Sequence, residues 1–537
     1  MRHSVIAASP DGARREKPID ASRRTICRPD EHEPGQGFRD PGPVDCNAVG
    51  PVPESATGAR AKEKTIAMNL YDRLTLDIEQ RIRDGVLRAG ERLPSVRQAC
   101  RSQRLSPSTV LKAYYQLESR GLIEARPKSG YYVRPRLRQP LPEPQITSPV
   151  GHATELNVSD FIFEILESVK DPTVVPFGSS FASPHLYPLA KLGRHLAAAA
   201  RHMDPLSTVT DLPPGNEELL RQISLRYLTG GVAVPPGEIV ITSGAMEALN
   251  LCLQAVTRPG DLIAVESPTF YAGLQAIERL GLRVVEIPTH PREGVSLTGL
   301  ADALRQHPVK ACLLMLNFQN PLGALVPDDN RRALVELLRR HDVPLIEDDT
   351  YAELYFGKQA PLAAKSLDTS GLVLHVSSFS KCLAPGYRVG WVAAGRFAQK
   401  IQRLKISTSL ATTIPVQIAL ADFLRHGAFD THLRRLRSML ELQETAMAAA
   451  IERHFPDGTR FARPRGGYLV WVELPPQVDA LALHRTALAH GISIAPGPIF
   501  SAKREYRNCI RLNFGHPWSD RFDSAMATLG GMIADQL

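Results

Sequence analysis

The chain has 537 residues, 43% of them hydrophobic, and carries a formal net charge of +8. This length is too great for one ordinary core and indicates two or three folded units. No apolar run approaches the ~20 residues that cross a bilayer. The N-terminal residues also lack the apolar core of a signal peptide, so we expect no membrane span and a cytoplasmic location. The seven cysteines are scattered without a Cys-x-x-Cys pair, which argues against both a disulfide framework and a metal site.

The first segment, residues 1–67, is rich in proline, glycine and charged residues and shows no helical or strand periodicity. Such a composition does not supply enough apolar surface for a core, so we predict a disordered N-terminal extension. Met68 stands directly before the first patterned segment. Translation from either Met1 or Met68 agrees with the sequence.

Residues 68–136 contain three helical patterns followed by two short strands. The first helix begins at Leu70, where apolar residues recur every three or four positions. A second, shorter helix follows. A third begins at Ser106, a good N-cap, with Pro107 at the first helical position, where its missing N–H has no cost. Two strands then flank a turn at 127–130, and the whole pattern predicts a winged helix-turn-helix of the α+β class.

The excess positive charge lies in this region, since residues 69–138 hold 15 Lys and Arg against 7 Asp and Glu. The third helix would place its N-terminal end in the major groove, and the turn between the strands would enter the neighbouring minor groove. The residues that we expect to contact DNA are Arg97, Ser106, Ser108, Thr109, Lys112, Lys128 and Gly130. A protein-interaction module with basic solvated faces is the alternative interpretation.

Residues 137–156 are rich in proline and predict a semi-extended linker. Residues 157–537 then alternate short apolar strands with helical stretches, which is typical of an α/β fold whose mainly parallel sheet is covered on both faces. The expected strands are 238–243, 262–267, 311–317, 344–349 and 372–378. Apolar segments at 468–474 and 509–514 predict a smaller α+β subdomain at the end of the chain.

Polar residues follow several of these strands, at the edge where ligands bind in α/β sheets. Lys381 ends one strand, and Asp348 and Tyr351 follow another. Pyridoxal phosphate needs an amine for an imine, a carboxylate for its ring nitrogen, and donors for its phenolate and phosphate oxygens. The remaining candidates are Asn320 for the phenolate, Ser378, Arg388 and the backbone of Ser243, Gly244 and Ala245 for the phosphate, and Arg511 for a ligand carboxylate. Taken singly, a turn explains Asn320 equally well. A structural ion pair is the less favoured alternative for Arg511.

Residues 85–133 resemble the winged-helix domain of the GntR family of bacterial regulators. The matching elements are LPSVR (93–97), SPSTVLKAYYQL (106–117) and GYYV (130–133). The resemblance implies DNA contacts at Arg97, Ser106, Ser108, Thr109 and Gly130. Pro107 stands where many relatives have arginine, which implies a different set of operator contacts.

Residues 155–537 resemble the fold-type-I aminotransferases, especially the branch that contains kynurenine and 2-aminoadipate aminotransferases. The matching elements include TSGAMEAL (242–249), NFQNPLG (317–323), IEDDTY (346–351), SSFSKCLAPGYRVGW (377–391) and IRLNFG (510–515). The resemblance implies an internal aldimine at Lys381, Asp348 at the ring nitrogen, Asn320 and Tyr351 at the phenolate, Ser378 and Arg388 at the phosphate, Phe270 stacked on the ring, and Arg511 at the ligand carboxylate. Ala245 and Met246 replace the Ser-Gln of related enzymes, so one phosphate hydroxyl is lost.

This order of domains resembles the MocR subfamily of GntR regulators, which implies a head-to-tail homodimer of the aminotransferase-like part. We therefore expect a bacterial cytoplasmic protein, associated with the nucleoid when it is bound to a double-stranded operator. In the first hypothesis, a small amine or amino acid forms an external aldimine at Lys381 and the change alters DNA binding. In the second, the protein is a working aminotransferase with an accessory DNA-binding domain, and in the third, pyridoxal phosphate is itself the signal.

Overall fold

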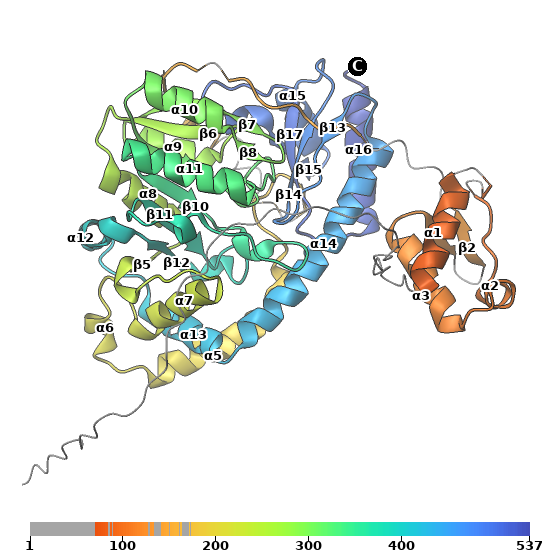
Figure 1. Ribbon diagram of the computed structural model, residues 1–537, viewed down its shortest axis with the longest axis horizontal. Helices are drawn as coiled ribbons and strands as arrows, with labels where there is room; N and C mark the ends of the chain where they lie inside the picture. Colours follow the sequence, from red (N-terminus) through yellow and green to blue (C-terminus); the bar gives the residue numbers. More distant parts are fainter. Residues whose placement is uncertain are drawn as a thin grey trace, which may run out of the picture. The chain divides into compact units, whose positions relative to one another are not determined.

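The computed structural model describes residues 70–83, 86–87, 90–126, 129–133, 141–149, 151–160, 162–163, 171 and 173–537. The extension predicted at 1–67 and the predicted DNA contact Lys128 lie outside these residues. A small helical part stands at the N-terminal end of the described chain, and a large α/β part follows it (Figure 1). Within the described residues, no helix is both long enough and apolar enough to cross a membrane.

The N-terminal part is the predicted winged helix-turn-helix. Its elements are α1 (Leu70–Arg83), α2 (Val96–Gln103), α3 (Pro107–Ser119), β1 (Ile123–Arg126) and β2 (Gly130–Val133). Ser106 caps α3 as predicted, because its hydroxyl accepts a hydrogen bond from the amide of Thr109 (3.2 Å). A capping box starts α2, in which Ser95 and Gln98 each bind the other's backbone amide.

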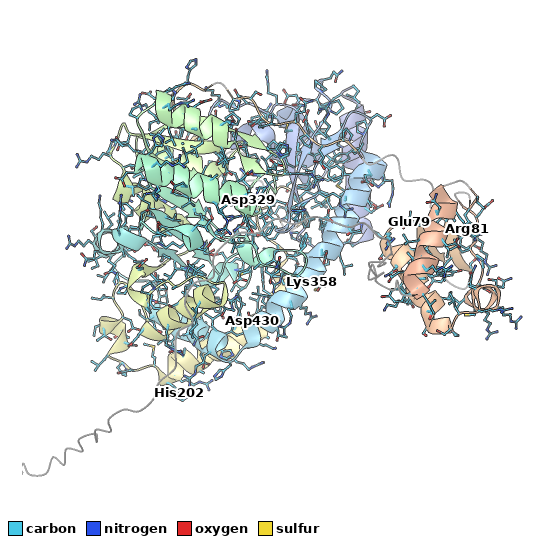
Figure 2. All side chains as sticks on the ribbon, in the orientation of Figure 1. Glu79, Arg81, His202, Asp329, Lys358 and Asp430 are labelled. Atoms are coloured by element: carbon cyan, nitrogen blue, oxygen red, sulfur yellow. The ribbon has the colours of Figure 1, made fainter. Side chains whose placement is uncertain are left out.

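One apolar core closes this winged helix. It is formed by Leu74, Ile78, Ile82, Leu93, Ala99, Val110, Ala113, Tyr114, Leu117, Ile123 and Val133. The two strands pair antiparallel with Ile123 opposite Val133, so both side chains enter the core together. On the surface, Arg120 after α3 donates to Glu79 of α1 (2.6 Å), which Figure 2 labels.

A nine-stranded mixed sheet forms the centre of the large part. In spatial order its strands are β3 (Thr154–Glu155), β7 (Arg283–His290), β6 (Leu262–Ser267), β9 (Val309–Leu314), β10 (Leu345–Asp348), β11 (Val373–Ser378), β12 (Gly390–Ala393) and β5 (Ile239–Thr242), with β8 (Gly294–Val295) beside β7. The strands from β7 to β11 run parallel, as predicted, whereas β3, β8 and β12 pair antiparallel with their neighbours. Strand β3 lies inside the segment that the sequence suggests is linker.

Helices cover both faces of this sheet, so apolar residues of its strands are buried on both sides. In β6, Ile263 and Val265 belong to the core beneath α8 and α9, whereas Leu262 and Ala264 belong to the core beneath α10 and α11. The helices of the large part before the small subdomain are α5 (Leu189–His202), α6 (Ser207–Thr210), α7 (Glu217–Thr229), α8 (Ala245–Val256), α9 (Tyr271–Arg279), α10 (Leu297–Gln306), α11 (Asp328–His341), α12 (Ala398–Thr408), α13 (Ile414–Arg425) and α14 (Ala428–His454).

A four-stranded antiparallel sheet forms the predicted smaller subdomain. Its order is β13 (Arg460–Phe461), β14 (Leu469–Glu473), β17 (Cys509–Asn513) and β16 (Ala495–Pro496), and it packs with α14, α15 (Ala480–Ala489) and α16 (Asp520–Ala534) in one apolar core. Strand β15 (Ile492–Ser493) pairs separately with β4 (Val175–Pro176). Short 3-10 turns are η2 (Pro184–Leu186), η3 (Pro236–Glu238), η4 (Ala352–Leu354), η5 (Ala364–Leu367), η6 (Pro385–Tyr387), η7 (Gly395–Phe397) and η8 (Gly497–Phe500).

Candidate functional site

Lys381 lies in the turn directly after β11, at the carboxyl edge of the sheet. Its Nζ donates to the backbone oxygen of Ser180 (2.7 Å) and lies 4.5 Å from the centre of the Phe181 ring. Burial, together with the positive charges of Arg511 and Arg388, lowers the pKa of Lys381 to about 7. Such an amine is substantially neutral at physiological pH and can therefore attack an aldehyde.

Asp348 ends β10, which lies next to β11 in the sheet, and only 3% of the residue is exposed. Burial raises the pKa of Asp348 to about 6, against the opposing effect of hydrogen bonds from Thr350, whose amide donates to it (3.2 Å). A buried carboxyl that exchanges its proton near neutral pH is suited to a hydrogen bond with a protonated ring nitrogen.

The turn between β5 and α8 faces Arg388. Gly244 has a φ of +89°, and a Cβ at this position would collide with the guanidinium of Arg388. That guanidinium donates to the backbone oxygen of Ser243 and to the hydroxyl of Ser380 (3.3 Å each), while Ser378 accepts from the amide of Ser380 (3.3 Å). Only glycine therefore leaves room between the N-terminus of α8 and Arg388, where backbone amides and a guanidinium would hold an anion such as a phosphate.

One of the three backbone amides predicted at this anion site already has a partner. The amide of Ser243 donates to the carboxylate of Glu247 (2.5 Å), which also pairs with Lys405 (2.9 Å). Gly244 and Ala245 stand at the start of α8, where N–H groups have no acceptor within the helix. The turn thus offers a phosphate the amides of these two residues.

Two buried side chains near the sheet edge, Asn320 and Tyr351, have donors suited to a phenolate oxygen. Asn320 is buried, and its Oδ1 accepts from Arg511 (3.2 Å), so its amide nitrogen is left to donate. The buried hydroxyl of Tyr351 has no hydrogen-bond partner among the described residues. A buried hydroxyl without a partner is costly, and a phenolate oxygen would satisfy it. Phe270 precedes α9 and packs, partly buried, between two apolar cores.

Arg511 of β17 is fully buried, with 0% of the residue exposed, and burial lowers its pKa. Its guanidinium donates to the backbone oxygens of Gly178 and Ser179 and to the hydroxyl of Ser180 (3.1 Å). Its Nε has no partner among the described residues. Because Ser180 binds both Arg511 and Lys381, the guanidinium and the amine face the same small space.

Two contributors to this space escaped the sequence analysis. Ser180 joins Lys381 and Arg511, and the hydroxyl of Tyr468 donates to the Ser180 backbone oxygen (2.9 Å). Gly-Ser-Ser-Phe has no periodicity or catalytic spacing, so the sequence gives no local signal for it. Only the pairing of distant segments brings it to the end of β11.

A buried polar chain behind Asp348 was also missed. His375 of β11 bonds Asp349 through Nε2 (2.9 Å) and the Tyr227 hydroxyl through Nδ1 (2.6 Å), and Trp391 donates to that hydroxyl (3.0 Å). These residues line a cavity of about 400 Å³ whose lining includes Ser378 but neither Lys381 nor Arg511. The acidic pair of IEDDTY was the one available signal, because two adjacent carboxyls at a strand end must face different surroundings.

The predicted recognition helix presents a cluster of hydroxyls at its N-terminal end. Ser106 bonds the hydroxyls of Ser108 (2.9 Å) and Thr109 (2.8 Å), and Ser106 and Ser108 are exposed. Lys112 lies one turn further along, and its Nζ lies 3.9 Å from the centre of the Tyr71 ring of α1. The three hydroxyls are therefore held as a group, whereas Lys112 would have to leave Tyr71 to reach DNA.

The wing contains one basic residue that the sequence analysis did not assign. Gly130 has a φ of +110°, and a Cβ there would lie 3.2 Å from Nε of Arg92. Arg92 is exposed and forms an isolated antiparallel bridge with Tyr132, so it extends the two-stranded wing. Arg97 is exposed on α2, as expected for a phosphate contact.

The described part of the chain holds no group of three or more His, Cys, Asp or Glu residues placed to bind a metal.

Comparison with known families agrees with this two-part geometry. The model of bacterial regulatory proteins of the gntR family matches residues 70–133, and the model of aminotransferase class I and II matches residues 194–521. The HTH-type transcriptional regulator YdcR of Escherichia coli K12 is 45% identical over 470 residues, which cover 88% of this chain and all of YdcR. The chain belongs to the MocR-type GntR regulators.

This MocR-type regulator is also similar to YjiR of the same organism, which is 39% identical over 87% of this chain and 99% of YjiR. Its large part resembles the crystal structure of the kynurenine aminotransferase of Pyrococcus horikoshii in complex with PMP, with 28% identity and a TM-score of 0.66 over 71% of this chain and 96% of that one. The α-aminoadipate aminotransferase LysN of Thermus thermophilus gives 28% identity and a TM-score of 0.65 over 70% and 95%. Homologues with this fold depend on pyridoxal phosphate, and that is the cofactor of the family.

Proposed function

We propose that this MocR-type regulator senses a small amine or amino acid at a pyridoxal phosphate held by Lys381 and changes its binding to a DNA operator in response. One observation carries the proposal: the Ser180 backbone oxygen accepts from Lys381, and the Ser180 hydroxyl accepts from Arg511. An imine-forming amine and a carboxylate-binding guanidinium thus face one ligand, in the same chain as a winged helix.

When bound, pyridoxal phosphate supplies an aldehyde that accepts primary amines. In the proposed site, Asp348 would hold the ring nitrogen, Asn320 and Tyr351 would donate to the phenolate, and Phe270 would stack on the ring. Arg388, Ser378 and the amides of Gly244 and Ala245 hold the phosphate. A ligand amine would displace Lys381, while Arg511 would exchange its backbone acceptors for the ligand carboxylate.

The DNA-binding face in this proposal consists of Ser106, Ser108, Thr109, Lys112, Arg97, Lys128 and the Gly130 wing. We divide the chain into a winged helix at 68–136, a linker at 137–156 and a sensor domain at 157–537. The fold supports a head-to-tail homodimer, and so do the exposed apolar side chains of Leu206, at the N-cap of α6, and Val209, within α6. Such a regulator would act in the bacterial cytoplasm, on the nucleoid when bound to its operator. A ligand can shift DNA binding only by its differential affinity for the two arrangements.

The test combines absorbance with DNA binding in the full-length protein. Genome-wide mapping of bound DNA first supplies an operator, and candidate amines are then titrated while the imine band and operator affinity are followed together. We expect wild type to show the band and an amine response, and Lys381→Ala to lose both. The matched control is Lys310→Ala, an exposed lysine on β9. A Lys381→Ala protein whose operator affinity still changes with amines as in wild type would refute the proposed sensing site.

Aminotransferase activity is the second candidate function. The aromatic-amino-acid aminotransferase 1 of Thermococcus litoralis is 30% identical over 70% of this chain and 92% of that enzyme. The lowered pKa of Lys381, about 7, also suits a general base that moves a proton at the ligand's α-carbon. Half-reactions with single amino acids test this function, because turnover converts the cofactor to its pyridoxamine form. Full conversion without any operator binding would favour the enzyme over the regulator.

A further inference from the structure

The proline-rich segment at residues 141–149, here named the linker clamp, lies against the large part of the molecule in the described chain. Leu141 packs on the main apolar core, and Pro144 is buried. The backbone oxygen of Pro142 accepts from the amide of Phe461 in β13 (3.0 Å). Glu143 forms an ion pair with Arg292, whose hydrogen bond lowers the pKa of Glu143. The polar, aperiodic sequence of this segment gave no sign of these contacts.

Thr147 makes the most specific contacts of the clamp. Its hydroxyl donates to the backbone oxygen of Ser267, the last residue of β6 (2.6 Å). The same hydroxyl accepts from the amide of Thr289 in β7 (2.8 Å), and the Thr147 amide donates to the Thr289 backbone oxygen (3.2 Å). One linker hydroxyl therefore joins the carboxyl ends of two adjacent strands.

The strand end that Thr147 holds leads directly to the cofactor site. Phe270, the proposed stacking residue, comes three residues after Ser267. The Ser267 hydroxyl donates to buried Glu286 (3.0 Å) and bonds the Tyr506 hydroxyl (2.8 Å). The amide of Thr269, between Ser267 and Phe270, donates to the backbone oxygen of Phe500 (2.8 Å). Ser267 is thus held by Thr147 of the linker and by Tyr506, which lies in the segment before β17. Strand β17 carries Arg511.

The clamp also bridges the nine-stranded and four-stranded sheets of the large part. Phe461 belongs to the four-stranded sheet with β17, whereas Thr289 and Ser267 belong to the nine-stranded sheet. Only a few residues of linker separate these attachments. A movement of one sheet relative to the other would stretch or release the clamp, because so short a segment has little slack.

We infer that Thr147 is a positioning residue of the cofactor site and that occupation of this site is coupled to the contacts of the linker clamp, which belongs to the segment after the winged helix. The inference rests on the proposed function for the presence of the cofactor. By linkage, whatever strengthens the clamp contacts strengthens cofactor binding, and cofactor binding strengthens the clamp by the same factor. Thr147 would touch neither the cofactor nor the ligand, and it acts through Ser267 and Phe270.

The test uses the full-length chain and three substitutions. Thr147→Val keeps the branched shape and removes the hydroxyl, and Thr147→Ser restores the hydroxyl. Thr154→Val is the matched control, because the Thr154 hydroxyl donates to His152 outside the clamp (3.2 Å). Apo protein is titrated with pyridoxal phosphate by absorbance, and amide hydrogen exchange is measured with and without the cofactor.

We expect Thr147→Val to weaken pyridoxal phosphate binding by about fivefold or more, the lower end of ordinary coupling between sites, while the other two variants bind like wild type. In wild type, the cofactor should slow exchange of the Thr289 amide. Equal affinity of Thr147→Val and wild type would overturn the inference, and so would a loss in Thr147→Ser equal to that in Thr147→Val.

The apo protein separates this inference from the proposed function. If wild type forms no imine band, the proposed function fails, and the positioning role is then decided by exchange of the Thr269 amide without cofactor. Thr147→Val should accelerate that exchange relative to wild type and Thr154→Val, because Ser267 is released two residues away. Unchanged exchange at Thr269 would show that Thr147 holds nothing in place.

Discussion

The cofactor site and the recognition helix differ in how far water reaches their polar side chains. At the cofactor site, Asp348 and Arg511 are buried, and burial shifts the pKa values of both. At the start of α3, Ser106 and Ser108 are exposed and bond each other. Electrostatic interactions are strong where water is excluded and weak where it is present. Substitutions should therefore have large, salt-independent effects in the first region and small, salt-dependent effects in the second.

The largest expected effect is the pH dependence of cofactor capture by Lys381. Only the neutral amine attacks an aldehyde, and the pKa of this lysine is lowered to about 7. The capture rate should rise about tenfold per pH unit below pH 7 and level off above it. An ordinary lysine, with a pKa of about 10.4, would keep rising to pH 10. At pH 7 the neutral fraction of Lys381 therefore exceeds that of a solvent-exposed lysine by about a thousandfold. Stopped-flow absorbance of apo protein mixed with pyridoxal phosphate from pH 5.5 to pH 9 measures it.

Nα-Acetyl-lysine in solution is the reference for that experiment. The Asp348→Asn variant tests how a neighbouring charge affects the pKa of Lys381. The negative charge of Asp348 raises the pKa of Lys381, while burial and Arg511 lower it. Removing that charge should move the plateau to lower pH. A capture rate that rises without a plateau through pH 9 would show that Lys381 is solvated like an exposed lysine, and the contrast with the recognition helix would disappear.

The next effect concerns Arg511→Lys, which keeps the charge and removes the planar pair of donors. Hydrogen bonds to charged groups contribute about 1.5–3 kcal/mol, so the affinity for an α-amino acid should fall by roughly 10- to 150-fold. The corresponding amine without the carboxylate should bind as it does to wild type. Absorbance titration with both ligands measures the difference. Equal losses for the two ligands would instead indicate that the pocket had collapsed around Gly178 and Ser179, whose oxygens Arg511 binds.

The sequence predicted the elements better than it predicted the contacts between distant segments. The parallel strands, the cap at Ser106 and the order of polar residues after the strands all follow from local patterns. Ser180 and Thr147 could not be found in this way, since each matters through a partner more than one hundred residues away. Arg92 was missed because a single bridge to Tyr132 has no strand-like pattern.

A smaller effect should separate structure from recognition within α3. Ser106→Ala removes the cap at the Thr109 amide, and loss of such a cap costs about 1 kcal/mol. Exchange of the Thr109 amide should then be roughly fivefold faster. Ser108→Ala leaves that cap in place, so exchange of the Thr109 amide should match wild type in this variant. Operator binding should nevertheless weaken. If Ser108→Ala accelerated exchange as much as Ser106→Ala, the hydroxyl cluster would be a structural unit with no separate DNA-binding member.

The smallest effect is expected from substitution of Lys112 in the recognition helix. Its effect on operator affinity should depend on salt, unlike the effects of substitutions at the buried cofactor site. A side chain that neutralises one phosphate contributes about one unit to the slope of log affinity against log salt, so Lys112→Ala should reduce that slope by about one.

Lys112 must first leave the Tyr71 ring, 3.9 Å from its Nζ, and an exposed contact of this kind is worth about 0.5–1 kcal/mol. Tyr71→Leu should therefore strengthen operator binding by roughly two- to fivefold at low salt, with the slope unchanged. Fluorescence anisotropy with a labelled operator over a series of salt concentrations measures both variants, and Arg97→Ala provides the comparison for an exposed guanidinium on α2. A slope that Lys112→Ala leaves unchanged would place Lys112 on Tyr71 in the DNA-bound protein as well, where it serves the packing of α1 on α3.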